Sequence, residues 1–481
     1  MPLILSGNVA SATAAVGYEV ANSCRFERAS TTKMVKTLGT PTSQTTFTIS
    51  CWMKKANTVD SNQFVCGWGS TGANYGYLNT FAGENKLDVY IDDGVGGSRR
   101  TYRLFRDYSA WYHIVLDVDT TEGDNADRIK LYVNGVQQTS FDDTRTTAEN
   151  YTILGLASGQ LFEVGKSGLV NHFDGYLAEF CFIDGLSLTP TSFGEFDSDS
   201  PTIWKPIDVS GLTFGNNGFY LDFEDSSNLG NDANGGTDLT ETNLDATDQA
   251  TDTPTNNFCV MNPLDNYYAG ATFAEGNCKI STSGNVTYTT ATMGLSAGKW
   301  YWEVQFINAT GSGGGGDNQY IGIVEKPSTG TTIQQGNSNF QNYFLAYNGE
   351  IRWTGTEITY ASSYTDGDII GVALDLTNNK IYFSKNGAWA TGSGAWDSTT
   401  FDAAVGDQAV TAVTSTSTGN YFPTVSYDDT KLGHFNFNFG GCPAFTVSSS
   451  NADANGYGSF EYAVPSGYLA LCTKNLGSDG G

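Results

Sequence analysis

The stretch IKLYVNGV at Ile129–Val136 has a counterpart later in the chain, KIYFSKNGA at Lys380–Ala388. Each follows another apolar run, WYHIVLDVD at Trp111–Asp119 and DIIGVALDL at Asp368–Leu376. Both pairs place alternating apolar residues on consecutive segments and include Asn-Gly, the dipeptide that best tolerates the positive φ angles of a tight hairpin turn. The pattern therefore predicts two all-β modules of one general design.

The composition favours strands and turns. Among 481 residues there are 57 Gly, 26 Tyr and 28 Phe, and charged residues make up only 16%, which is far from the composition of helical proteins. A chain of this length can form two or three domains with separate cores. We expect an all-β fold with two jelly-roll β-sandwiches in tandem.

The charge balance argues against one class of partner. With 24 basic and 51 acidic residues, the formal net charge is 24 − 51 = −27, and a charge of this sign repels nucleic acid. No segment of the sequence is long and apolar enough to cross a bilayer, so we expect no membrane insertion. The opening MPLILSGNVASATAA lacks the positive region of a secretory signal and is interpreted as a retained, extended N-terminal arm.

Cysteine and histidine give no metal or cofactor site. The eight cysteines show no C-x-x-C pair and no close spacing, so buried free thiols are favoured, although an even number leaves disulfides open. Cys51 shares a strand face with Phe47, Ile49 and Met53, as a small apolar residue would. His113 lies inside an apolar strand, where a hydrogen-bonded core histidine is favoured over a metal ligand. We expect neither a metal nor a cofactor.

Strand and turn patterns also suggest domain boundaries. Ten acidic and no basic residues occur from Asp208 to Asp252, a composition that buries little apolar surface. This segment is predicted to be a linker or, alternatively, a strand or two along a domain edge. The expected order is an N-terminal arm or anchor at 1–25, a first sandwich at 26–205, an acidic Asn/Gly/Thr-rich linker at 206–258, a second sandwich at 259–472 and a flexible tail at 473–481.

The second module resembles a SPRY domain. The likeness is carried by KWYWEV, YIGIV, DGDIIGVALDLTNNKIYFSKNG, YFPTVS and FNFG, at Lys299–Val304, Tyr320–Val324, Asp366–Gly387, Tyr421–Ser426 and Phe437–Gly440. SPRY domains are concanavalin-like β-sandwiches that bind proteins or glycans through loops and are not enzymes. The resemblance therefore implies recognition.

The first module resembles the laminin-G or concanavalin-like lectin family. FTISCWMKK at Phe47–Lys55 and DGYLAEFCFIDG at Asp174–Gly185 carry this likeness, together with the first pair of apolar runs. Many laminin-G-like domains bind calcium through loop carboxylates, for which Asp92, Asp93 and the stretch Asp119–Asp127 are possible donors. No EF-hand spacing is present, so a solvated acidic loop is favoured over a bound ion.

The chain as a whole is similar to virion proteins of tailed bacteriophages. Phrases that carry this likeness include MPLILSG at the start, DGYLAEFCFIDGLSLTPTSFGEF, ATDQATDTPTNNFCVMNPL and GYGSFEYAVPSGYLALCTKNL. The resemblance implies a virion protein of tail-fibre or receptor-binding type, synthesised in the host cytoplasm, with other virion proteins and a host-surface glycan or protein as partners. It also implies a homo-oligomer, with a trimer favoured. A capsid decoration or head-fibre protein with a mainly stabilising role is the alternative.

Aromatic rings on loops are the side chains expected to stack on sugar rings. Trp389 and Trp396 lie in the Gly-rich GAWATGSGAWDS and are the first candidates, although folding back over the sandwich edge is equally compatible with the sequence. Trp68, Tyr75 and Tyr77 in GWGSTGANYGYL form a second candidate group.

Four basic residues form a cluster in this acidic sequence, namely Arg99, Arg100, Arg103 and Arg106. This cluster suits an acidic polysaccharide or a carboxylate-rich face of a neighbouring subunit. A charged guard on an exposed strand edge explains it equally well.

No catalytic pattern is found in the sequence. Glycan hydrolysis in such a fold would need carboxylates at alternating strand positions, as in E-x-D-x-x-E. Neither this pattern nor a G-x-S-x-G turn nor a convincing Cys–His pair occurs. We expect a non-enzymatic protein, with a polysaccharide depolymerase as the least favoured alternative.

Overall fold

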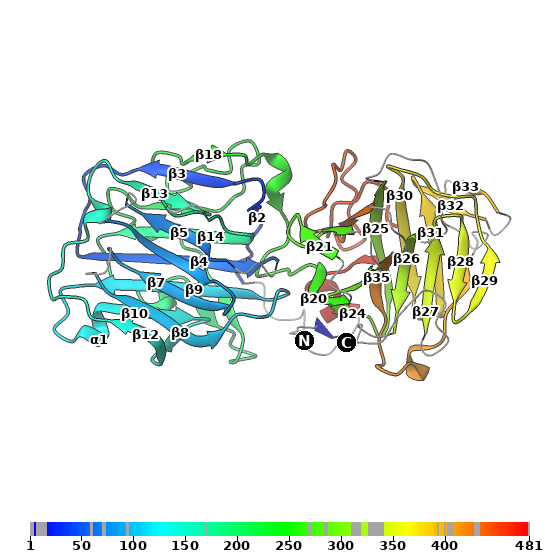
Figure 1. Ribbon diagram of the computed structural model, residues 1–481, viewed down its shortest axis with the longest axis horizontal. Coiled ribbons are helices and arrows are strands. Elements are labelled where there is room, and N and C mark those ends of the chain that lie inside the picture. Colours follow the sequence, from blue (N-terminus) through cyan, green and yellow to red (C-terminus); the bar gives the residue numbers. More distant parts are fainter. Residues whose placement is uncertain are drawn as a thin grey trace. The chain divides into compact units, whose positions relative to one another are not determined.

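Strands dominate the computed structural model of the chain (Figure 1). Two compact units are present, an N-terminal unit of residues 14–255 and a C-terminal unit of residues 256–481, to which residues 1–13 also belong. This nearly all-β architecture confirms the predicted fold class. The structure describes residues 4–5, 17–57, 61–69, 74–92, 96–168, 171–267, 271–282, 287–308, 319–325, 341–391, 394–398, 401, 407–427 and 433–479.

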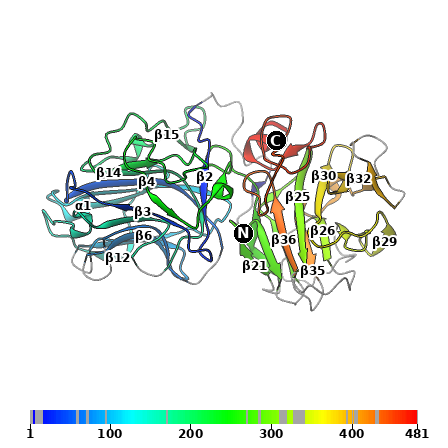
Figure 2. The same ribbon diagram turned by 90° about the horizontal axis from the view of Figure 1, so that it is seen from above.

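The N-terminal unit is a sandwich of two sheets. Figure 2 shows β4 and β14 in one layer and β3, β6 and β12 in the other. The first sheet contains, in spatial order, β11 (Val136–Gln138), β10 (Ile129–Val133), β9 (Trp111–Asp119), β4 (Thr46–Lys55), β14 (Gly175–Asp184), β2 (Ser23–Phe26) and β19 (Gln249–Ala250), with β17 (Phe219–Leu221) also paired to β14. The second sheet contains β12 (Phe141–Arg145), β8 (Ser98–Leu104), β7 (Lys86–Tyr90), β6 (Gly76–Phe81), β5 (Gln63–Trp68), β13 (Leu161–Val164), β3 (Lys33–Thr37) and β18 (Thr240–Thr242). Smaller elements are α1 (Asn125–Arg128), the pair β15 (Gly194–Phe196) and β16 (Trp204–Pro206), and the 3-10 turns Leu154–Leu156, Pro190–Ser192 and Ala246–Asp248.

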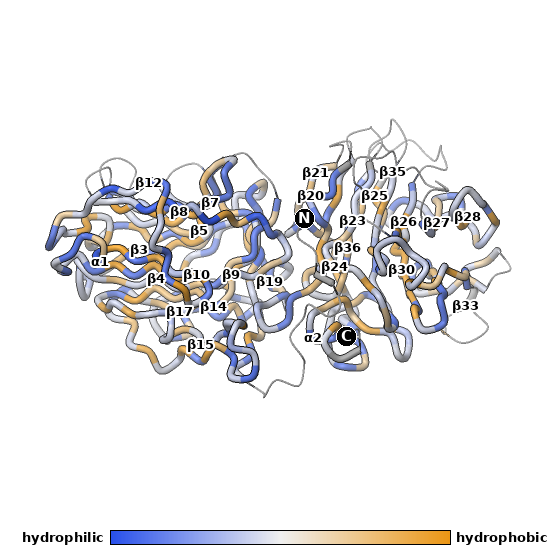
Figure 3. Tube along the Cα trace, turned by 90° about the horizontal axis from the view of Figure 1, so that it is seen from below, coloured by the Kyte–Doolittle hydropathy of each residue, from blue (hydrophilic) through white to orange (hydrophobic). Residues whose placement is uncertain are grey.

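Strand β4 shows why the two sheets pack together. Phe47, Ile49, Cys51 and Met53 alternate along it and are fully buried in one core, because successive side chains of a strand point to opposite faces. Cys51 therefore acts as the small apolar residue that its position predicted. All eight cysteines are buried and free, which confirms the favoured interpretation of buried thiols. Figure 3 shows hydrophobic stretches following the strands.

Both Asn-Gly dipeptides form the predicted two-residue turns. Asn134 and Gly135 join β10 to β11 with φ angles of 49° and 76°, and Val133 pairs with Val136. Asn386 and Gly387 have φ angles of 50° and 80° at the equivalent turn of the C-terminal unit. Positive φ angles at both central residues are the requirement that Asn-Gly meets at low cost.

The acidic segment belongs to the N-terminal unit, which differs from the linker predicted at 206–258. Strands β17, β18 and β19 lie within it and pair with β14, β3 and β2, so the alternative of strands laid along a domain edge describes it. Three of its carboxylates also form ion pairs with basic side chains of the sandwich, which offsets the cost of burying them. These pairs are Asp232–Lys36 at 3.3 Å, Asp248–Arg25 at 3.1 Å and Asp252–Lys54 at 2.6 Å.

The C-terminal unit is a second sandwich. One sheet contains, in spatial order, β20 (Met261–Tyr267), β23 (Thr287–Ala291), β35 (Phe422–Tyr427), β26 (Gln319–Val324), β27 (Asn342–Ala346), β28 (Glu350–Trp353) and β29 (Thr356–Thr359). The other contains β21 (Ala271–Ala274), β22 (Lys279–Thr282), β36 (Gly433–Asn438), β25 (Lys299–Asn308), β30 (Ile369–Asp375), β31 (Lys380–Lys385), β32 (Ala388–Ala390) and β33 (Trp396–Ser398), with β34 (Gln408–Ala409) paired to β31 and β37 (Leu469–Ala470) to β25. A 3-10 turn at Val413–Ser415 completes the unit.

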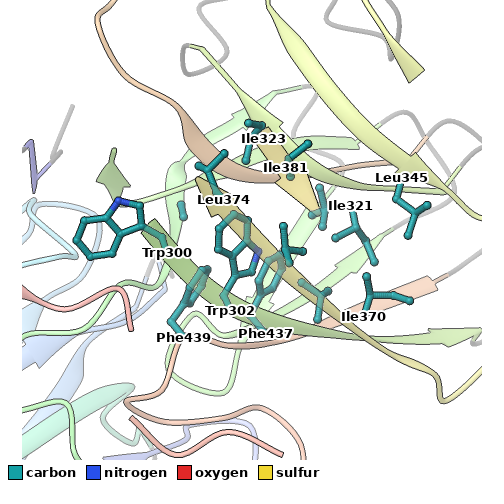
Figure 4. Close-up of a cluster of buried hydrophobic side chains, with 14 of the residues drawn as sticks. Trp300, Trp302, Ile321, Ile323, Leu345, Ile370, Leu374, Ile381, Phe437 and Phe439 are labelled. Carbon is teal, nitrogen blue, oxygen red and sulfur yellow. The ribbon is translucent and has the colours of Figure 1, made fainter. Parts of the chain in front are cut away.

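The core of the C-terminal unit lies between these sheets. Trp300, Trp302, Val304 and Phe306 alternate along β25 and are at most 1% exposed, because every second side chain of a strand faces the same side of the sheet. Figure 4 shows the two tryptophans among branched aliphatic side chains of the same core. Burial of large side chains of this kind contributes roughly 1.5–3 kcal/mol each.

The two ends of the chain are more ordered than the sequence predicted. Within the predicted arm 1–25, β1 (Ile4–Leu5) pairs in parallel with β24 (Met293–Gly294), and β2 begins at Ser23. Residues 1–3 and 6–16 lie outside the described part. In the tail predicted to be flexible, α2 (Thr473–Asp479) places Leu476 in the core at 1% exposure. An apolar residue flanked by small and polar ones gave no periodic signal for this helix.

Candidate functional site

A pocket lies on the outer face of the sheet that contains β25, β30, β31 and β32. Its volume is about 430 Å³, which falls in the range of roughly 300–1,000 Å³ typical of small-molecule sites. We call it the aromatic pocket. Its lining consists of Tyr301, Ser384, Gly387, Trp389, Phe401, Tyr462, Ala463, Val464, Pro465 and Ser466.

Strand β25 supplies the floor of the aromatic pocket. Because Trp300 and Trp302 face the core, Tyr301 and Glu303 face the opposite side of the sheet. That side is not open to water, since both side chains are 0% exposed. The chain folds back over them after β36, and residues 462–466 form one wall of the pocket.

Glu303 fastens this wall to the sheet. Its Oε1 accepts hydrogen bonds from the Tyr301 hydroxyl at 3.0 Å and the Tyr462 backbone N–H at 2.9 Å. Its Oε2 accepts from the Asn438 side chain at 3.1 Å and the Glu461 backbone N–H at 3.0 Å. Burial raises the pKa of Glu303 to about 7, and the hydrogen bonds oppose this shift. This buried carboxyl group therefore helps to hold the covering segment, together with contacts such as the pairing of β37 with β25.

Gly371 makes room for two hydroxyl groups at the floor of the pocket. Gly371 on β30 pairs with Ser384 on β31, and a Cβ atom at Gly371 would lie 2.4 Å from Ser384 Oγ and 2.9 Å from the Tyr301 hydroxyl. Both hydroxyls therefore border the position above Gly371. Ser384 is 0% exposed, and its hydroxyl has no hydrogen-bond partner among the described residues.

Aromatic side chains close the remaining sides. Trp389 is 4% exposed and packs edge-on against Phe401, with ring centroids 4.8 Å apart. At Gly387, where φ is 80°, a Cβ atom would lie 2.6 Å from the Tyr462 ring. Glycine is therefore favoured at this turn for two reasons. It adopts the positive φ angle at low cost, and it has no Cβ atom to prevent Tyr462 from packing against the turn.

Among the described residues that line the aromatic pocket, no side chain carries a formal charge at neutral pH. The Glu303 carboxyl group, on the same strand face as Tyr301, is engaged by four donors. The pocket therefore offers aromatic faces and hydroxyl groups rather than ionic contacts. Such a surface suits a neutral ligand with an apolar face and hydroxyl groups.

The predicted tryptophans occupy three different environments. Trp389 lines the aromatic pocket as a buried wall, not as an exposed loop residue. Trp396 is half-buried and folds back over the sandwich, with its Nε1 donating to the Ser362 carbonyl at 2.7 Å. Trp68 is 1% exposed and belongs to the core, which contradicts its prediction as a ligand-binding residue. A Cβ atom at Gly76 would lie 2.3 Å from the Trp68 ring, so this glycine makes room for it.

Tyr75 and Tyr77 do form a surface in the N-terminal unit. Together with Tyr90 they make three nearly parallel rings, whose centroids are 5.4 to 6.1 Å apart. We call this group the tyrosine strip. The exposed Arg145 lies beside it, and its guanidinium donates to the Tyr90 hydroxyl at 3.2 Å. The tyrosine strip is a second candidate surface for a ligand.

The four predicted arginines do not act as one cluster. Arg99 is 3% exposed and donates to backbone carbonyls of Arg145 and Asn125. Arg100 lies on the opposite face of β8, where it stacks over the Phe81 ring at 3.5 Å and pairs with Asp88. Arg103 and Arg106 are exposed. Alternation along the strand separates residues that are adjacent in the sequence.

The carboxylates considered for calcium have other partners. Asp92 accepts hydrogen bonds from the Tyr151 hydroxyl and two backbone N–H groups, and Asp124 caps α1. Asp93 lies outside the described residues. In the part of the chain that the structure covers, no group of three His, Cys, Asp or Glu side chains is arranged to hold a metal.

His113 is a core histidine, as predicted. Trp204 Nε1 donates to its Nδ1 at 2.9 Å, and its Nε2 lies 2.9 Å from the Ser50 hydroxyl. Burial lowers the pKa of His113 to about 3, so the ring is neutral. No helix within the described ranges is long and apolar enough to span a membrane.

Sequence analysis missed Ser384, Tyr301, Glu303 and residues 462–466. Tyr301 and Glu303 were quoted only as part of the stretch KWYWEV that resembles a SPRY domain. The signal that could have drawn attention to them is the Glu in the middle of the most regular alternating strand of the chain. Its burial depends on a cover more than 150 residues away in sequence, which local patterns do not reveal.

Comparisons with protein families identify both modules. Residues 29–191 match the concanavalin A-like lectin/glucanases superfamily in its laminin-G branch, and residues 299–440 match the SPRY domain. A laminin-G-like domain followed by a SPRY domain, as predicted, is therefore found. No curated protein matches the sequence.

Several solved structures are similar to parts of this chain. The SPRY domain of human HERC1 is 21% identical, with a TM-score of 0.26, and the match covers 37% of this chain and 96% of that one. A putative carbohydrate binding protein from Bacteroides ovatus is 18% identical, with a TM-score of 0.33 and coverage of 47% and 61%. Domain 4 of the extracellular arabinanase AbnA from Geobacillus stearothermophilus, in complex with arabinotriose, is 18% identical, with a TM-score of 0.23 and coverage of 31% and 65%.

Proposed function

We propose that this chain is a non-enzymatic virion protein of a tailed bacteriophage, of tail-fibre or receptor-binding type, which attaches the particle to a glycan of the host surface. It acts as a homo-oligomer, with a trimer favoured, and joins other virion proteins on the particle. Its two lectin-like sandwiches provide the binding surfaces. The aromatic pocket is the observation that carries the binding role.

The assignment to a virion rests on the sequence. Phrases resembling tailed-phage virion proteins run from MPLILSG at the start to GYLALCTKNL near the end. Both domain types are common recognition modules, and a host-attachment protein requires recognition at its surface. The acidic balance of the chain, with a formal net charge of −27, keeps such a particle component soluble and repels nucleic acid.

The binding role rests on the aromatic pocket. Tyr301, Trp389 and Tyr462 bring three aromatic rings around a space of about 430 Å³, and the Ser384 hydroxyl lies there without a partner. A lining with aromatic faces and hydroxyl groups is that of a binding site for a polar, neutral ring. The described lining contains no carboxylate pair, and glycan hydrolysis uses such a pair.

The direct test is to locate the chain on intact particles of the virus that encodes it. Gold-labelled antibodies against the purified chain are expected at the tail, and an excess of purified chain is expected to reduce adsorption of these particles to their host. A signal confined to the head, without competition for adsorption, would instead assign the chain to capsid decoration or a head fibre. Absence of the chain from purified particles would refute the virion assignment.

Release of oligosaccharides from the host envelope is the check on the non-enzymatic role. Purified chain incubated with isolated envelope polysaccharide is expected to leave its size distribution unchanged. A shift to smaller fragments would identify a depolymerase.

A further inference from the structure

We infer that the aromatic pocket binds one uncharged sugar ring of a glycan, and that Ser384 is the residue that recognises a ring hydroxyl. The inference rests on the proposed function, because it names the ligand class of that binding site. It depends on three features of the pocket, which are its unpaired hydroxyl, its lack of charge and its aromatic walls.

The unpaired hydroxyl is the first feature. Ser384 is fully buried and has no partner among the described residues, and leaving a buried hydroxyl unpaired costs roughly 1–3 kcal/mol. Such groups in a folded protein call for an explanation. A hydroxyl group of a bound sugar would supply the missing hydrogen bond, either as donor or as acceptor, once a side chain of the pocket wall moves to admit it, because Ser384 is 0% exposed in the free chain.

The lack of charge is the second feature. The described part of the lining contains no Asp, Glu, Lys, Arg or His, and a buried ion without a counter-ion is strongly unfavourable. The Glu303 carboxyl group, on the same strand face as Tyr301, is already engaged by four donors. The described lining therefore favours neutral hexoses and deoxyhexoses over uronic and sialic acids as the ring inside the pocket.

The aromatic walls are the third feature. Trp389 and Tyr462 belong to separate segments that approach each other across the turn at Gly387. Aromatic faces pack favourably against the C–H groups of a pyranose while its hydroxyl groups point sideways. An aliphatic or proline side chain from a protein partner would also contact these rings, but it would leave the Ser384 hydroxyl unpaired. The observations therefore favour a sugar over a peptide.

A matched pair of serine variants tests this assignment in the full chain. Ser384→Ala removes the unpaired hydroxyl in the pocket, and Ser426→Ala removes another buried hydroxyl that lacks a partner but lies on β35, outside the pocket. Calorimetric titration would use maltotriose, cellotriose and mannotriose as neutral probes. Trigalacturonate would serve as the charged counterpart, and N-acetyltryptophanamide as the probe for an aromatic side chain.

The expected result is binding of at least one neutral trisaccharide to the wild-type chain. This binding becomes about tenfold weaker or more in Ser384→Ala and stays within about twofold in Ser426→Ala. Equal binding to wild type and Ser384→Ala would overturn the inference. So would binding of none of the neutral probes, or Ser384-dependent binding of trigalacturonate or N-acetyltryptophanamide alone.

Failure of this inference differs from failure of the proposed function. If the chain resides on virus particles and blocks their adsorption equally well with Ser384→Ala, the proposed function stands and the pocket is not its glycan site. If the chain is absent from particles, the proposed function fails whatever the sugar titration shows.

Discussion

The two units carry the same hairpin but differ in what lies beside it. In the N-terminal unit, the Asn134 side-chain oxygen accepts from the backbone N–H of His113 at 2.8 Å, and the Asn134 N–H donates to the carbonyl of the same residue. In the C-terminal unit, Asn386 makes the same two contacts with Ile369, the first at 2.9 Å. The turn and its anchoring are therefore equivalent in both sandwiches.

The difference lies in a row of three side chains that crosses the outer face of each sheet. The last residue of each row lies two residues before the Asn-Gly turn. The rows are Ser50, Val115 and Tyr132 across β4, β9 and β10, and Glu303, Gly371 and Ser384 across β25, β30 and β31. In the first row, the valine and tyrosine pack beneath the covering segment in an apolar cluster. In the second, glycine and serine take their place, and Ser384 lines the aromatic pocket. The shared scaffold thus carries different side chains at equivalent positions beneath its cover.

The largest effect is expected at the first position of the row in the C-terminal unit, which is Glu303. Glu303→Ser should destabilise the chain by about 3 kcal/mol or more, because four buried donors lose their acceptor. Ser50→Ala, the matched change in the N-terminal unit, should cost only about 1 kcal/mol, since it removes one hydrogen bond to His113. Chemical denaturation of both variants measures the difference. Equal losses would show that Glu303 does not fasten the cover.

The two units should also respond to pH in opposite directions through these residues. The folded pKa of Glu303, about 7, lies above its ordinary value of 4.5, so its stabilising contribution is full below pH 4.5 and is lost as the pH rises through 7. The folded pKa of His113, about 3, lies below 6.5, so its contribution is present above pH 6.5 and is lost as the pH falls toward 3. Each shift corresponds to at most about 3–5 kcal/mol.

Thermal unfolding of wild type, Glu303→Gln and His113→Gln between pH 4 and pH 8 would measure these contributions. The fall in stability between pH 5 and pH 8 should be smaller in Glu303→Gln than in wild type, and the fall below pH 6 should be smaller in His113→Gln. Parallel profiles for all three proteins would contradict the assigned ionisation states.

A smaller effect is expected at the glycines of the turns. A Cβ atom would lie 2.5 Å from the Trp204 ring at Gly135 and 2.6 Å from the Tyr462 ring at Gly387. Gly135→Ala and Gly387→Ala should therefore each cost roughly 1–3 kcal/mol, because an aromatic ring must move and a positive φ angle is disfavoured. Only the second should alter ligand binding. Urea denaturation checks the stabilities, and markedly unequal losses would show that the two covers differ in rigidity.

The smallest effect on stability is expected from removing one serine hydroxyl group from each row, and the two changes should have opposite signs. Ser384→Ala should raise stability by up to about 1 kcal/mol, since it removes a buried hydroxyl without a partner, whereas Ser50→Ala lowers it. The measurement is the free energy of unfolding of both variants against wild type. A clear loss in Ser384→Ala would mean that its hydroxyl has a partner in the free protein.

Sequence patterns predicted the sandwiches well but not what covers them. The strand face that Cys51 shares with Phe47 and Met53 was predicted correctly because period-2 burial is a local property. The acidic segment was predicted to be a linker because its partners are remote, as in the ion pair between Asp252 and Lys54. Its low apolar content gave no sign that basic residues of the sandwich would neutralise it.

The candidate site was predicted only in part for a similar reason. Trp389 was selected for its ring and its Gly-rich surroundings, and it does line the aromatic pocket. Trp68 was selected on the same grounds and is a core residue, since a strand position and a loop position look alike beside glycine. Ser384 gave no signal, because whether a buried hydroxyl group has a hydrogen-bond partner depends on residues that are distant in the sequence.

The most direct test is to give the row of the C-terminal unit the tyrosine that ends the row of the N-terminal unit. Ser384→Tyr places a tyrosine at the position equivalent to Tyr132 in the N-terminal unit. This variant would be titrated with the trisaccharide that binds the wild-type chain. We expect Ser384→Tyr to be destabilised by roughly 1–3 kcal/mol, because a larger side chain enters a buried position, yet to remain folded and no longer bind the sugar. Undiminished binding by folded Ser384→Tyr would show that the glycan binds elsewhere and would contradict the assignment of the aromatic pocket.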